Sequence, residues 1–454
     1  MKKLVKFAEY ILFLLFLVLC IFFKQKLSIL LTIPVLFFLY YFYKKEKIKN
    51  YELFLFCTAF IVRLISIILL KVEITDDFKT MYEASLSILK SNFDFMNGFY
   101  FQTYPFQLGL TLYQALILKI IPSVFLLKLL NSIYTSFIVL YLYKISKIFV
   151  KEKIARIISF SYLFYFYPIY LNSVLTNQHI PALLMLISIY FLFTKKDSLK
   201  YACIIGLLLG FANFFRTESI IMIMAIFIYQ LIYITRKNYK IIFRYLIVFL
   251  FTYFAFTTFT TKMISISPIY QSINIEEKQD KNVTLWKFYC GLSDKYNGLY
   301  NEEDVEAYFN TNKEKELLMT RVKEDYKKFP VLFLKKEVIL WTQTNYDLRI
   351  LNSLQGFWNK LVLNFNQGYL NLIIILLVIS LIPKKEEDNK EVIFIKLFIG
   401  LYYGIYLFIE ISPRYAYNLH MLVFLLLGIG LEKIICKCNQ LYTKNNRKLV
   451  ERNQ

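Results

Sequence analysis

The chain has 454 residues, of which 58% are hydrophobic and 19% aromatic, and its formal net charge is +22. Apolar stretches long enough to cross a bilayer recur along most of the sequence, which excludes a soluble protein and indicates a multi-pass membrane protein. The lysines and arginines lie in short clusters between these stretches. We therefore expect the charge to meet anionic membrane lipids and not nucleic acid.

The apolar stretches predict an all-α fold, a polytopic bundle of about 12–13 transmembrane helices, because only a helix satisfies its own backbone in lipid. No signal-peptide cleavage pattern accompanies the first stretch, so we interpret it as a retained anchor. The predicted spans lie near residues 8–23, 28–43, 51–70, 124–142, 157–173, 178–194, 200–215, 219–235, 241–260, 367–383, 392–410 and 415–435.

Basic loops predict the orientation of this bundle, because Lys and Arg concentrate in cytoplasmic loops. Residues 107–121 are apolar enough to cross, but crossing would place the basic loop 144–156 outside. We therefore expect 107–121 to cross incompletely, as an interfacial or re-entrant segment. The segments expected in the cytoplasm are 44–50, 144–156, 194–200, 235–240, 384–391 and 436–454.

The same argument places every large polar segment on the opposite, outer face. The expected domains are an N-terminal transmembrane hairpin (1–50), a transmembrane core (51–261) with a first outer loop (71–106), an extracytoplasmic segment (262–365), C-terminal spans (366–435) and a cytoplasmic basic tail (436–454).

Two adjacent carboxylates, Asp76 and Asp77, open the predicted helix of the first outer loop, which Thr75 can cap. Acidic residues in a first turn stabilise the helix dipole, and this structural role is the simpler interpretation. A helix N-terminus also keeps a carboxylate ionised, as a general base requires, so the two roles are compatible. The helix has one apolar side, as an interfacial helix needs. That side consists of Phe78, Met81, Tyr82, Ser85, Leu86 and Leu89.

In the second outer segment, Thr311 and Glu314 match a capping box. The pattern predicts a helix that begins there and carries an apolar stripe. The stripe consists of Leu318, Val322, Tyr326 and Phe329. We expect residues 262–365 to form a small helical cap on the membrane, without a separate enzyme domain.

Two further junctions on the outer face carry charged residues, which are costly in or beside spans and therefore mark candidate sites. Arg216 and Glu218 lie between two spans, and Glu410 and Arg414 precede the last one. Each arginine can pair with a neighbour or reach a lipid headgroup. Two arginines on the face of the acidic pair suggest a site for an anionic group such as a lipid phosphate.

Other polar residues allow both structural and functional interpretations. His179 lies between two apolar stretches and is more often a packing residue than a catalyst. Lys335 and Lys336 could hold phosphates or anchor the chain at the interface. Arg63 lies in mid-span, where a buried ion pair is the only role we expect, and Tyr104 shapes the loop beside the acids.

The sequence predicts no metal site and no cofactor. The six cysteines lack ligand spacing, so neither a zinc site nor a disulfide framework is expected. The sequence contains no Gly-rich phosphate loop, no His/Cys ligand set and no internal repeat.

Short motifs of the outer segments form a known arrangement between residues 50 and 435. They are TDDF at 75–78, YPFQLG at 104–109, GL at 291–292, GLY at 298–300, a helix through Arg321, KK at 335–336 before Trp341, and EISPRY at 410–415. In this arrangement the chain resembles the GT-C superfamily of polytopic glycosyltransferases. It is most similar to bacterial proteins related to protein O-mannosyltransferases and aminoarabinose lipid A transferases, a family 39-like group.

The resemblance implies a polyprenyl-phosphate sugar as donor, used at the outer face with inversion at the anomeric carbon. The catalytic base of the family is an acid of the first outer loop, which corresponds to Asp76 or Asp77. Many relatives carry Asp-Glu there, so the choice between the two stays open. Residues 1–46 depart from the common layout. The superfamily also includes metal-dependent members, so the use of a divalent metal stays open.

The hypothesis from the sequence is a cell-membrane glycosyltransferase with its active site on the extracytoplasmic side. Asp76 or Asp77 accepts the proton of an acceptor hydroxyl on a glycan, glycolipid or protein. The residues expected to bind the donor phosphate are Arg216, Arg414, Lys335 and Lys336. The other residues expected in the substrate site are Tyr104, His179, Glu218 and Glu410.

Two alternatives remain open. A polymerase that joins lipid-linked polysaccharide units would also place arginines at an outer site, but it would not require acids in the first outer loop. A non-enzymatic transporter or flippase of lipid-linked sugars predicts charged groups along mid-membrane helices and a repeat between the two halves.

Overall fold

The computed structural model describes residues 2–23, 26–44, 48–195, 198–273, 283–342, 356–382 and 389–452. Within these ranges the regular secondary structure is helical, apart from one isolated β-bridge between Leu299 and Ile411. The all-α prediction is therefore confirmed. The expectations for 274–282, 343–355 and most of the loop 384–391 lie outside the described residues.

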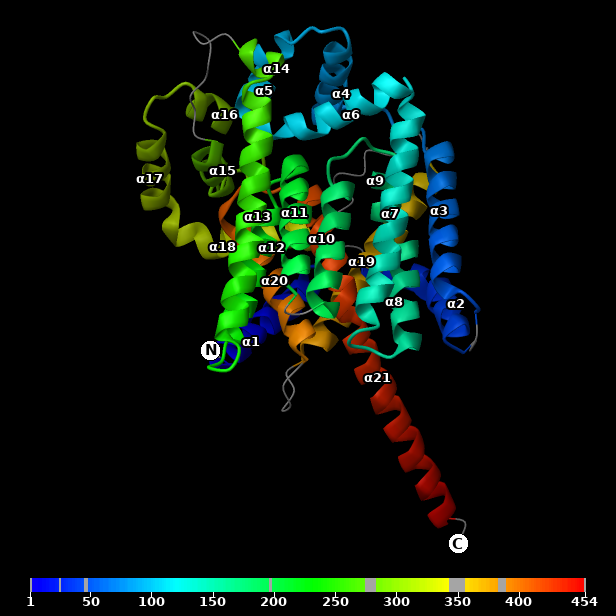
Figure 1. The fold of residues 1–454 in the computed structure, drawn as a ribbon. Coiled ribbons are helices and arrows are strands. Elements are labelled where there is room, and N and C mark those ends of the chain that lie inside the picture. Colours follow the sequence, from blue (N-terminus) through cyan, green and yellow to red (C-terminus); the bar gives the residue numbers. More distant parts are fainter. Residues whose placement is uncertain are drawn as a thin grey trace.

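Figure 1 shows the arrangement of the helices. Those up to residue 232 are α1 (Lys2–Leu19), α2 (Ile33–Lys44), α3 (Tyr51–Leu69), α4 (Asp76–Leu89), α5 (Phe99–Thr103), α6 (Leu108–Ile120), α7 (Val124–Ser146), α8 (Glu152–Phe164), α9 (Phe166–Leu171), α10 (His179–Thr194), α11 (Leu199–Phe215) and α12 (Ser219–Ile232). The later ones are α13 (Tyr239–Ser265), α14 (Pro268–Gln271), α15 (Val283–Gly291), α16 (Glu302–Phe309), α17 (Glu314–Asp325), α18 (Phe329–Thr342), α19 (Phe357–Leu381), α20 (Lys390–Phe408) and α21 (Ala416–Arg452). Short 3-10 helices are η1 (Cys20–Phe22), η2 (Lys26–Thr32), η3 (Asp94–Asn97), η4 (Pro105–Gln107), η6 (Tyr326–Lys328) and η9 (Pro413–Tyr415).

Among the described residues, six helices are long and apolar enough to cross a membrane, so the chain is a multi-pass membrane protein with six candidate spans. They are α3, α7, α13, α19, α20 and α21, the last counted from η9. The helices α10, α11 and α12 are apolar but have only 16, 17 and 14 residues. A straight crossing needs about 20 residues. The six candidates are half of the number of spans that the sequence predicts.

The predicted span 157–173 is not a single helix. The helix α8 ends at Phe164, and α9 runs from Phe166 to Leu171. Pro168 explains the break, because it has no N–H to bond the carbonyl of Phe164 four residues earlier, and its ring would clash with that carbonyl. Two short helices therefore replace the expected span.

The segment 107–121 forms α6, which has 13 residues. At 1.5 Å per residue this helix is about 20 Å long, shorter than the roughly 30 Å of a bilayer core. It packs against α4. The length agrees with the expectation that this segment does not cross completely.

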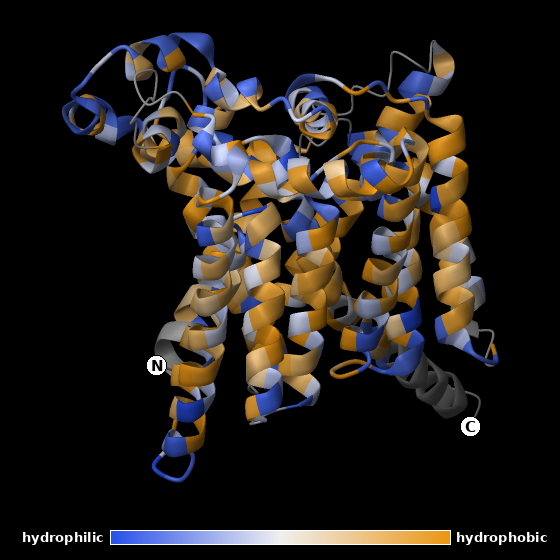
Figure 2. Ribbon diagram, turned by 45° about the horizontal axis from the view of Figure 1, so that its top comes forward, coloured by the Kyte–Doolittle hydropathy of each residue, from blue (hydrophilic) through white to orange (hydrophobic). Residues whose placement is uncertain are grey.

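The two ends of the bundle carry its polar parts. Figure 1 shows α4, α5, α6, α14 and α16 at one end, whereas the connections α7–α8, α10–α11 and α12–α13 lie at the other. Figure 2 shows hydrophilic residues gathered at both ends and mostly hydrophobic helices between them. We call the end that holds α4 and α16 the outer end, since the basic loops that the sequence assigns to the cytoplasm lie opposite.

Two small hydrophobic cores order the outer end. Met81, Phe101 and Phe215 belong to the first, which packs α4 and α5 against the end of α11. Trp286 and Tyr308 belong to the second, which joins α15 and α16 to apolar residues of α17. The outer segments are therefore packed structures that can hold side chains in fixed positions.

The predicted start of α4 is correct in position, whereas α17 begins two residues later than a capping box with Thr311 at the N-cap predicts. The helix α17 begins at Glu314, yet its N-cap residue is Lys313 and not Thr311. Thr75 is the N-cap residue of α4, but its side chain accepts no hydrogen bond from the helix. Its hydroxyl donates instead to Oδ2 of Asp76 at 3.0 Å.

Candidate functional site at the outer end

Asp77 forms an ion pair with Arg414, although the two residues are 337 positions apart. Nη2 of Arg414 lies 2.5 Å from Oδ2 of Asp77. The side chains of Asp77 and Arg414 are 36% and 25% exposed, so a ligand can reach both. The pair joins the first outer loop to the start of the last span.

Asp76 differs from its neighbour in conformation and surroundings. Its φ is 51°, in the left-handed region that Asp tolerates better than most residues. It is exposed, and its carboxylate accepts the hydroxyl of Thr75. Asp77 is paired with an arginine and remains partly accessible, and we take it as the carboxylate of the site.

Tyr415 lies among three cationic side chains. The centroid of its ring is 5.4 Å from Cζ of Arg216, 5.8 Å from Cζ of Arg414 and 6.0 Å from Nζ of Lys287. Cations at about 6 Å or less from an aromatic ring are attracted to it. One ring thus lies beside three cations, each of which is paired with a carboxylate, and the pair of Arg414 with Asp77 is the most exposed of the three.

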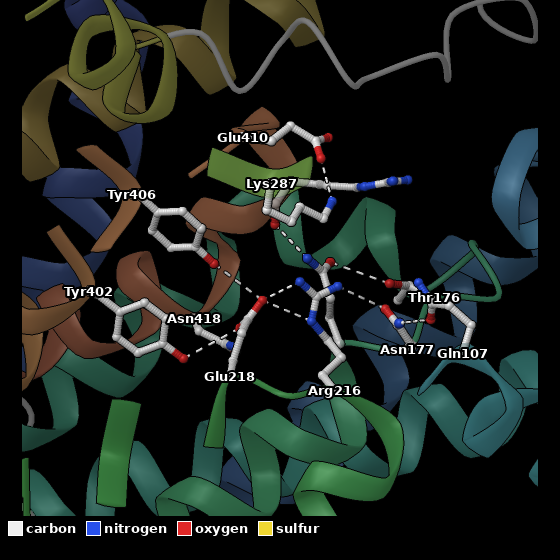
Figure 3. Close-up of polar contacts among 12 residues, drawn as sticks. Gln107, Thr176, Asn177, Arg216, Glu218, Lys287, Tyr402, Tyr406, Glu410 and Asn418 are labelled. Atoms are coloured by element: carbon white, nitrogen blue, oxygen red, sulfur yellow. Dashed lines mark hydrogen bonds and ion pairs between the residues drawn. The ribbon is translucent and has the colours of Figure 1, made fainter. Parts of the chain in front are cut away.

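Arg216 and Glu218 form a buried ion pair with many partners (Figure 3). Their side chains are 13% and 10% exposed. The carboxylate of Glu218 also accepts hydrogen bonds from Tyr402, Tyr406 and Asn418. These contacts join the junction between α11 and α12 to α20 and α21, so the pair holds the helices together at the site.

Lys287 is a site residue that the sequence did not indicate. Its Nζ forms an ion pair with Glu410 (Figure 3) and lies 5.2 Å from the ring centroid of Tyr104. Burial alone would lower the pKa of Lys287, but the Glu410 carboxylate, helped by Tyr415 and Tyr104, offsets this and raises it. The ammonium therefore stays charged. Tyr104 is held in turn, since its hydroxyl accepts a hydrogen bond from Trp286 at 3.2 Å.

Two glycines allow the close backbone contacts on which the site depends. A Cβ atom on Gly291 would lie 2.2 Å from the carbonyl carbon of Ile409, so only glycine lets the end of α15 pass beside the Glu410 junction. A Cβ atom on Gly109 would lie 1.7 Å from the carbonyl oxygen of Phe214. This contact brings α6 against the end of α11, just before the buried ion pair.

The connection between α9 and α10 positions both arginines. Asn177 donates to Oε1 of Gln107 at 2.7 Å, and its Oδ1 accepts Nη1 of Arg216 at 3.0 Å. Gln178 donates to the backbone carbonyl of Arg414 at 2.5 Å. Figure 3 shows Asn177 and Gln107 on one side of Arg216 and Glu218 on the other. Asn177 and Gln178, which lie between two apolar stretches of the sequence, therefore hold the two arginines of the site in position.

Tyr100 adds a hydroxyl next to the carboxylate. The buried oxygen of this hydroxyl has no hydrogen-bond partner among the described residues. Burial raises the pKa of Tyr100, and the Asp77 carboxylate raises it further. The hydroxyl therefore stays protonated, and it can donate a hydrogen bond to a ligand.

His179 and Lys335 have partners that do not belong to this group. Nδ1 of His179 lies 2.9 Å from the hydroxyl of Tyr417, and Nε2 lies 3.1 Å from the carbonyl oxygen of Leu171. The imidazole is buried, in agreement with the packing role. Lys335 is half-exposed and pairs with Asp294 at 3.0 Å.

Lys336 is buried, and its ammonium is fully used by the backbone. It donates to the carbonyl oxygens of Gly291, Leu407 and Ile409 at 2.9, 2.7 and 2.7 Å. An ammonium group has three N–H donors, so none is left for a phosphate. Lys336 instead ties the end of α15 to the end of α20, contrary to the expected role in donor binding.

Tyr100, Tyr415 and Lys287 belong to the site, but the sequence contains little indication of them. Tyr100 and Tyr415 are two of 37 tyrosines, so their residue type alone could not single them out. Lys287 was visible only as a charge between Trp286 and an apolar neighbour. Its pairing with a carboxylate 123 positions away depends on the fold.

The site therefore combines an accessible carboxylate with several cations and a buried hydroxyl donor. A carboxylate can accept a proton, and the cations can bind a phosphate and stabilise charge that develops on it. Among the described residues, no group of three or more His, Cys, Asp or Glu side chains could hold a metal ion.

The chain was compared with protein families and with curated proteins. No protein-family model matches the sequence, and no curated protein is significantly similar to it.

Proposed function

We propose that this protein is a membrane glycosyltransferase that moves a sugar from a polyprenyl-phosphate donor to an acceptor hydroxyl at the outer end. The observation that carries the proposal is the contact of Asp77 with Arg414 beside a ring that also attracts Arg216 and Lys287. A carboxylate that can serve as a base and a guanidinium that can bind phosphate therefore lie side by side, where both can reach one bound donor. The resemblance to GT-C glycosyltransferases supports the same assignment.

The chemistry follows from the positions of these groups. A donor phosphate competes with Asp77 for Arg414, because both are anionic partners for one guanidinium. Once released, the Asp77 carboxylate accepts the proton of the acceptor hydroxyl, whose oxygen attacks the anomeric carbon of the sugar. The bond from that carbon to the phosphate oxygen breaks, and the phosphate leaves with the electron pair. Arg414 and Lys287 stabilise the added negative charge.

The buried pair has a supporting part in this proposal. Glu218 neutralises Arg216 and accepts hydrogen bonds from Tyr402 and Tyr406, while Arg216 also donates to Asn177. Arg216 therefore positions the α11–α12 junction beside Tyr415, while Arg414 makes the direct contact with phosphate. Lys335 and Lys336 have other partners and are left out of the donor site.

The test is release of polyprenyl phosphate by the purified full-length chain from a panel of radiolabelled polyprenyl-phosphate hexoses and pentoses. This readout needs no identified acceptor, since water can serve as one. We expect Asp77→Asn to lower the rate by about 10²–10⁴-fold, as loss of a general base does. Asp76→Asn is the matched control and should retain a rate within about threefold of the unchanged protein, because it keeps the Asp77–Arg414 contact.

The same variants, expressed in cells at equal levels, are compared for cell-surface glycan composition. Wild-type glycan in cells that carry Asp77→Asn would refute the assignment of the base. Movement of the lipid-linked sugar across vesicle membranes without formation of a glycosidic bond would replace the transferase by a flippase. Joining of lipid-linked oligosaccharides that persists in Asp77→Asn would favour the polymerase.

A further inference from the structure

Arg63 lies inside the bundle on α3 and is fully buried. Nη1 of this side chain donates to the carbonyl of Ala59, one turn earlier in the same helix, at 3.3 Å. Nε and Nη2 have no hydrogen-bond partner among the described residues. Two of the three guanidinium nitrogens are thus unsatisfied in the interior.

The sequence predicts a buried ion pair for Arg63, and the structure contradicts this expectation. In the described part of the chain, no carboxylate lies within ion-pair distance of its guanidinium. The ionisable groups that interact electrostatically with Arg63 are Tyr162, Tyr417 and His179. Tyrosine and histidine side chains with their ordinary pKa values carry no negative charge at neutral pH. The positive charge therefore has no protein counter-ion nearby.

A second polar contact joins the end of α8 to α21 three residues further along both segments. Nε2 of His420 also has no hydrogen-bond partner in the described residues, while Nδ1 lies 2.9 Å from the hydroxyl of Tyr165. Tyr165 and His420 lie three positions after Tyr162 and Tyr417, respectively, which interact with each other in the same interior. The interior next to Arg63 therefore contains several tyrosine hydroxyl and imidazole groups.

An uncompensated guanidinium in such a place is costly. Removing an ion from water costs several kcal/mol even after relaxation, and arginine does not lose its proton to avoid that cost. A water molecule could satisfy the N–H groups but would not neutralise the charge. An anion would do both.

We propose that Arg63 binds a small monovalent inorganic anion of the size of chloride, held by Nε and Nη2 of Arg63 beside the Tyr162 hydroxyl. The anion acts as the counter-ion of Arg63 and stabilises the position of this residue of α3 near Tyr162 of α8 and Tyr417 of α21. The proposal is independent of sugar transfer, because it rests on a different part of the molecule.

The test is thermal unfolding of the purified full-length chain in an uncharged detergent, with chloride replacing gluconate at constant ionic strength. A ligand that binds only the folded state stabilises it in proportion to the logarithm of its concentration above Kd. We therefore expect the Tm of the unchanged protein to rise continuously with chloride. Arg63→Met should remove this rise.

The net charge of +22 allows weak binding of anions at the surface, so a matched control is needed. Arg244 is an exposed arginine of α13, and Arg244→Met removes the same charge without touching the interior. This variant should retain the chloride-dependent rise. An equal rise in Arg63→Met and Arg244→Met would overturn the proposal.

A second variant covers the case in which Arg63→Met does not fold. Tyr162→Phe removes one donor beside the anion and should move the chloride titration to higher concentration. Line broadening of the ³⁵Cl NMR signal by the protein, reduced in the same variant, gives an independent readout. A Tm that is the same in chloride and gluconate, or a titration that Tyr162→Phe leaves unchanged, would show that internal water and not an anion solvates Arg63.

Discussion

Two arginine–carboxylate pairs of the candidate site are made of similar groups in different surroundings. Arg216 and Glu218 are 13% and 10% exposed, and Glu218 has three further hydrogen-bond donors around it. Arg414 and Asp77 are 25% and 36% exposed. The first pair is held in place by burial and by the hydrogen bonds to Glu218. The second pair is open to solvent, so Arg414 can exchange Asp77 for another anion.

This difference separates a supporting role from a reacting role. A buried pair cannot open cheaply, because each charge would remain in the interior without its partner. An accessible pair can open when a phosphate offers the arginine an equivalent contact. We therefore assign the position of the helices to Arg216–Glu218 and substrate exchange to Asp77–Arg414.

The largest effect is expected from breaking the buried pair. Glu218→Gln leaves Arg216 without its counter-charge, and loss of one partner of a buried pair costs about 3–5 kcal/mol. We expect a marked fall in Tm of the purified protein, together with loss of activity. Asp77→Asn is the comparison variant and should leave Tm nearly unchanged. If Glu218→Gln kept the wild-type Tm, the buried pair would not be a scaffold.

A large but different effect is expected at the accessible pair. Arg414→Met removes a contact to the leaving phosphate, which should lower the rate of polyprenyl phosphate release by about 10²–10³-fold. Arg414→Lys keeps the charge but loses the planar, bidentate donor geometry. Its rate of polyprenyl phosphate release should therefore lie between that of wild type and that of Arg414→Met. Tm should change little in both variants.

The matched control for this prediction is Lys335→Met. This substitution removes a charge that pairs with Asp294. Lys335 is also one of the residues that the sequence predicts to bind the donor phosphate. Its rate should stay within about twofold of wild type. A loss as large as that of Arg414→Met would return Lys335 to the donor site.

A smaller effect is expected from the unpaired hydroxyl. Tyr100→Phe removes only the donor near Asp77, and a hydrogen bond to a charged group contributes about 1.5–3 kcal/mol. The rate of release should therefore fall by about 10–100-fold, while Tm should hold or rise, since a buried unsatisfied group is removed. Tyr296→Phe, at the surface pair with Glu303, is the control and should have no effect. Full activity of Tyr100→Phe would exclude contact with the substrate.

The sequence predicts what depends on neighbouring residues. Apolar stretches indicate the helices, and the start of α4 at Asp76 follows from a polar step before an amphipathic pattern. The contact of Arg216 with Glu218 was among the alternatives because the two are nearly adjacent. The break at Pro168 was also available from the sequence, since proline interrupts a helix in a known way.

The contacts that define the site could not be predicted, because they join distant segments. Asp77 and Arg414 are 337 positions apart, and only packing of α4 against the start of the last span brings them together. Lys336 shows the opposite failure. Its residue type suggests a phosphate ligand, but burial among three carbonyl groups determines what it does.

The most direct test of the central claim is the affinity of the purified protein for polyprenyl phosphate, measured against uncharged polyprenol. If phosphate and Asp77 compete for Arg414, Asp77→Asn should bind polyprenyl phosphate about tenfold more tightly than wild type, a change of about 1.4 kcal/mol. Arg414→Met should bind it more weakly, and binding of polyprenol should be equal in all three. Unchanged affinity for the phosphate in both variants would contradict a shared site for the carboxylate and the donor.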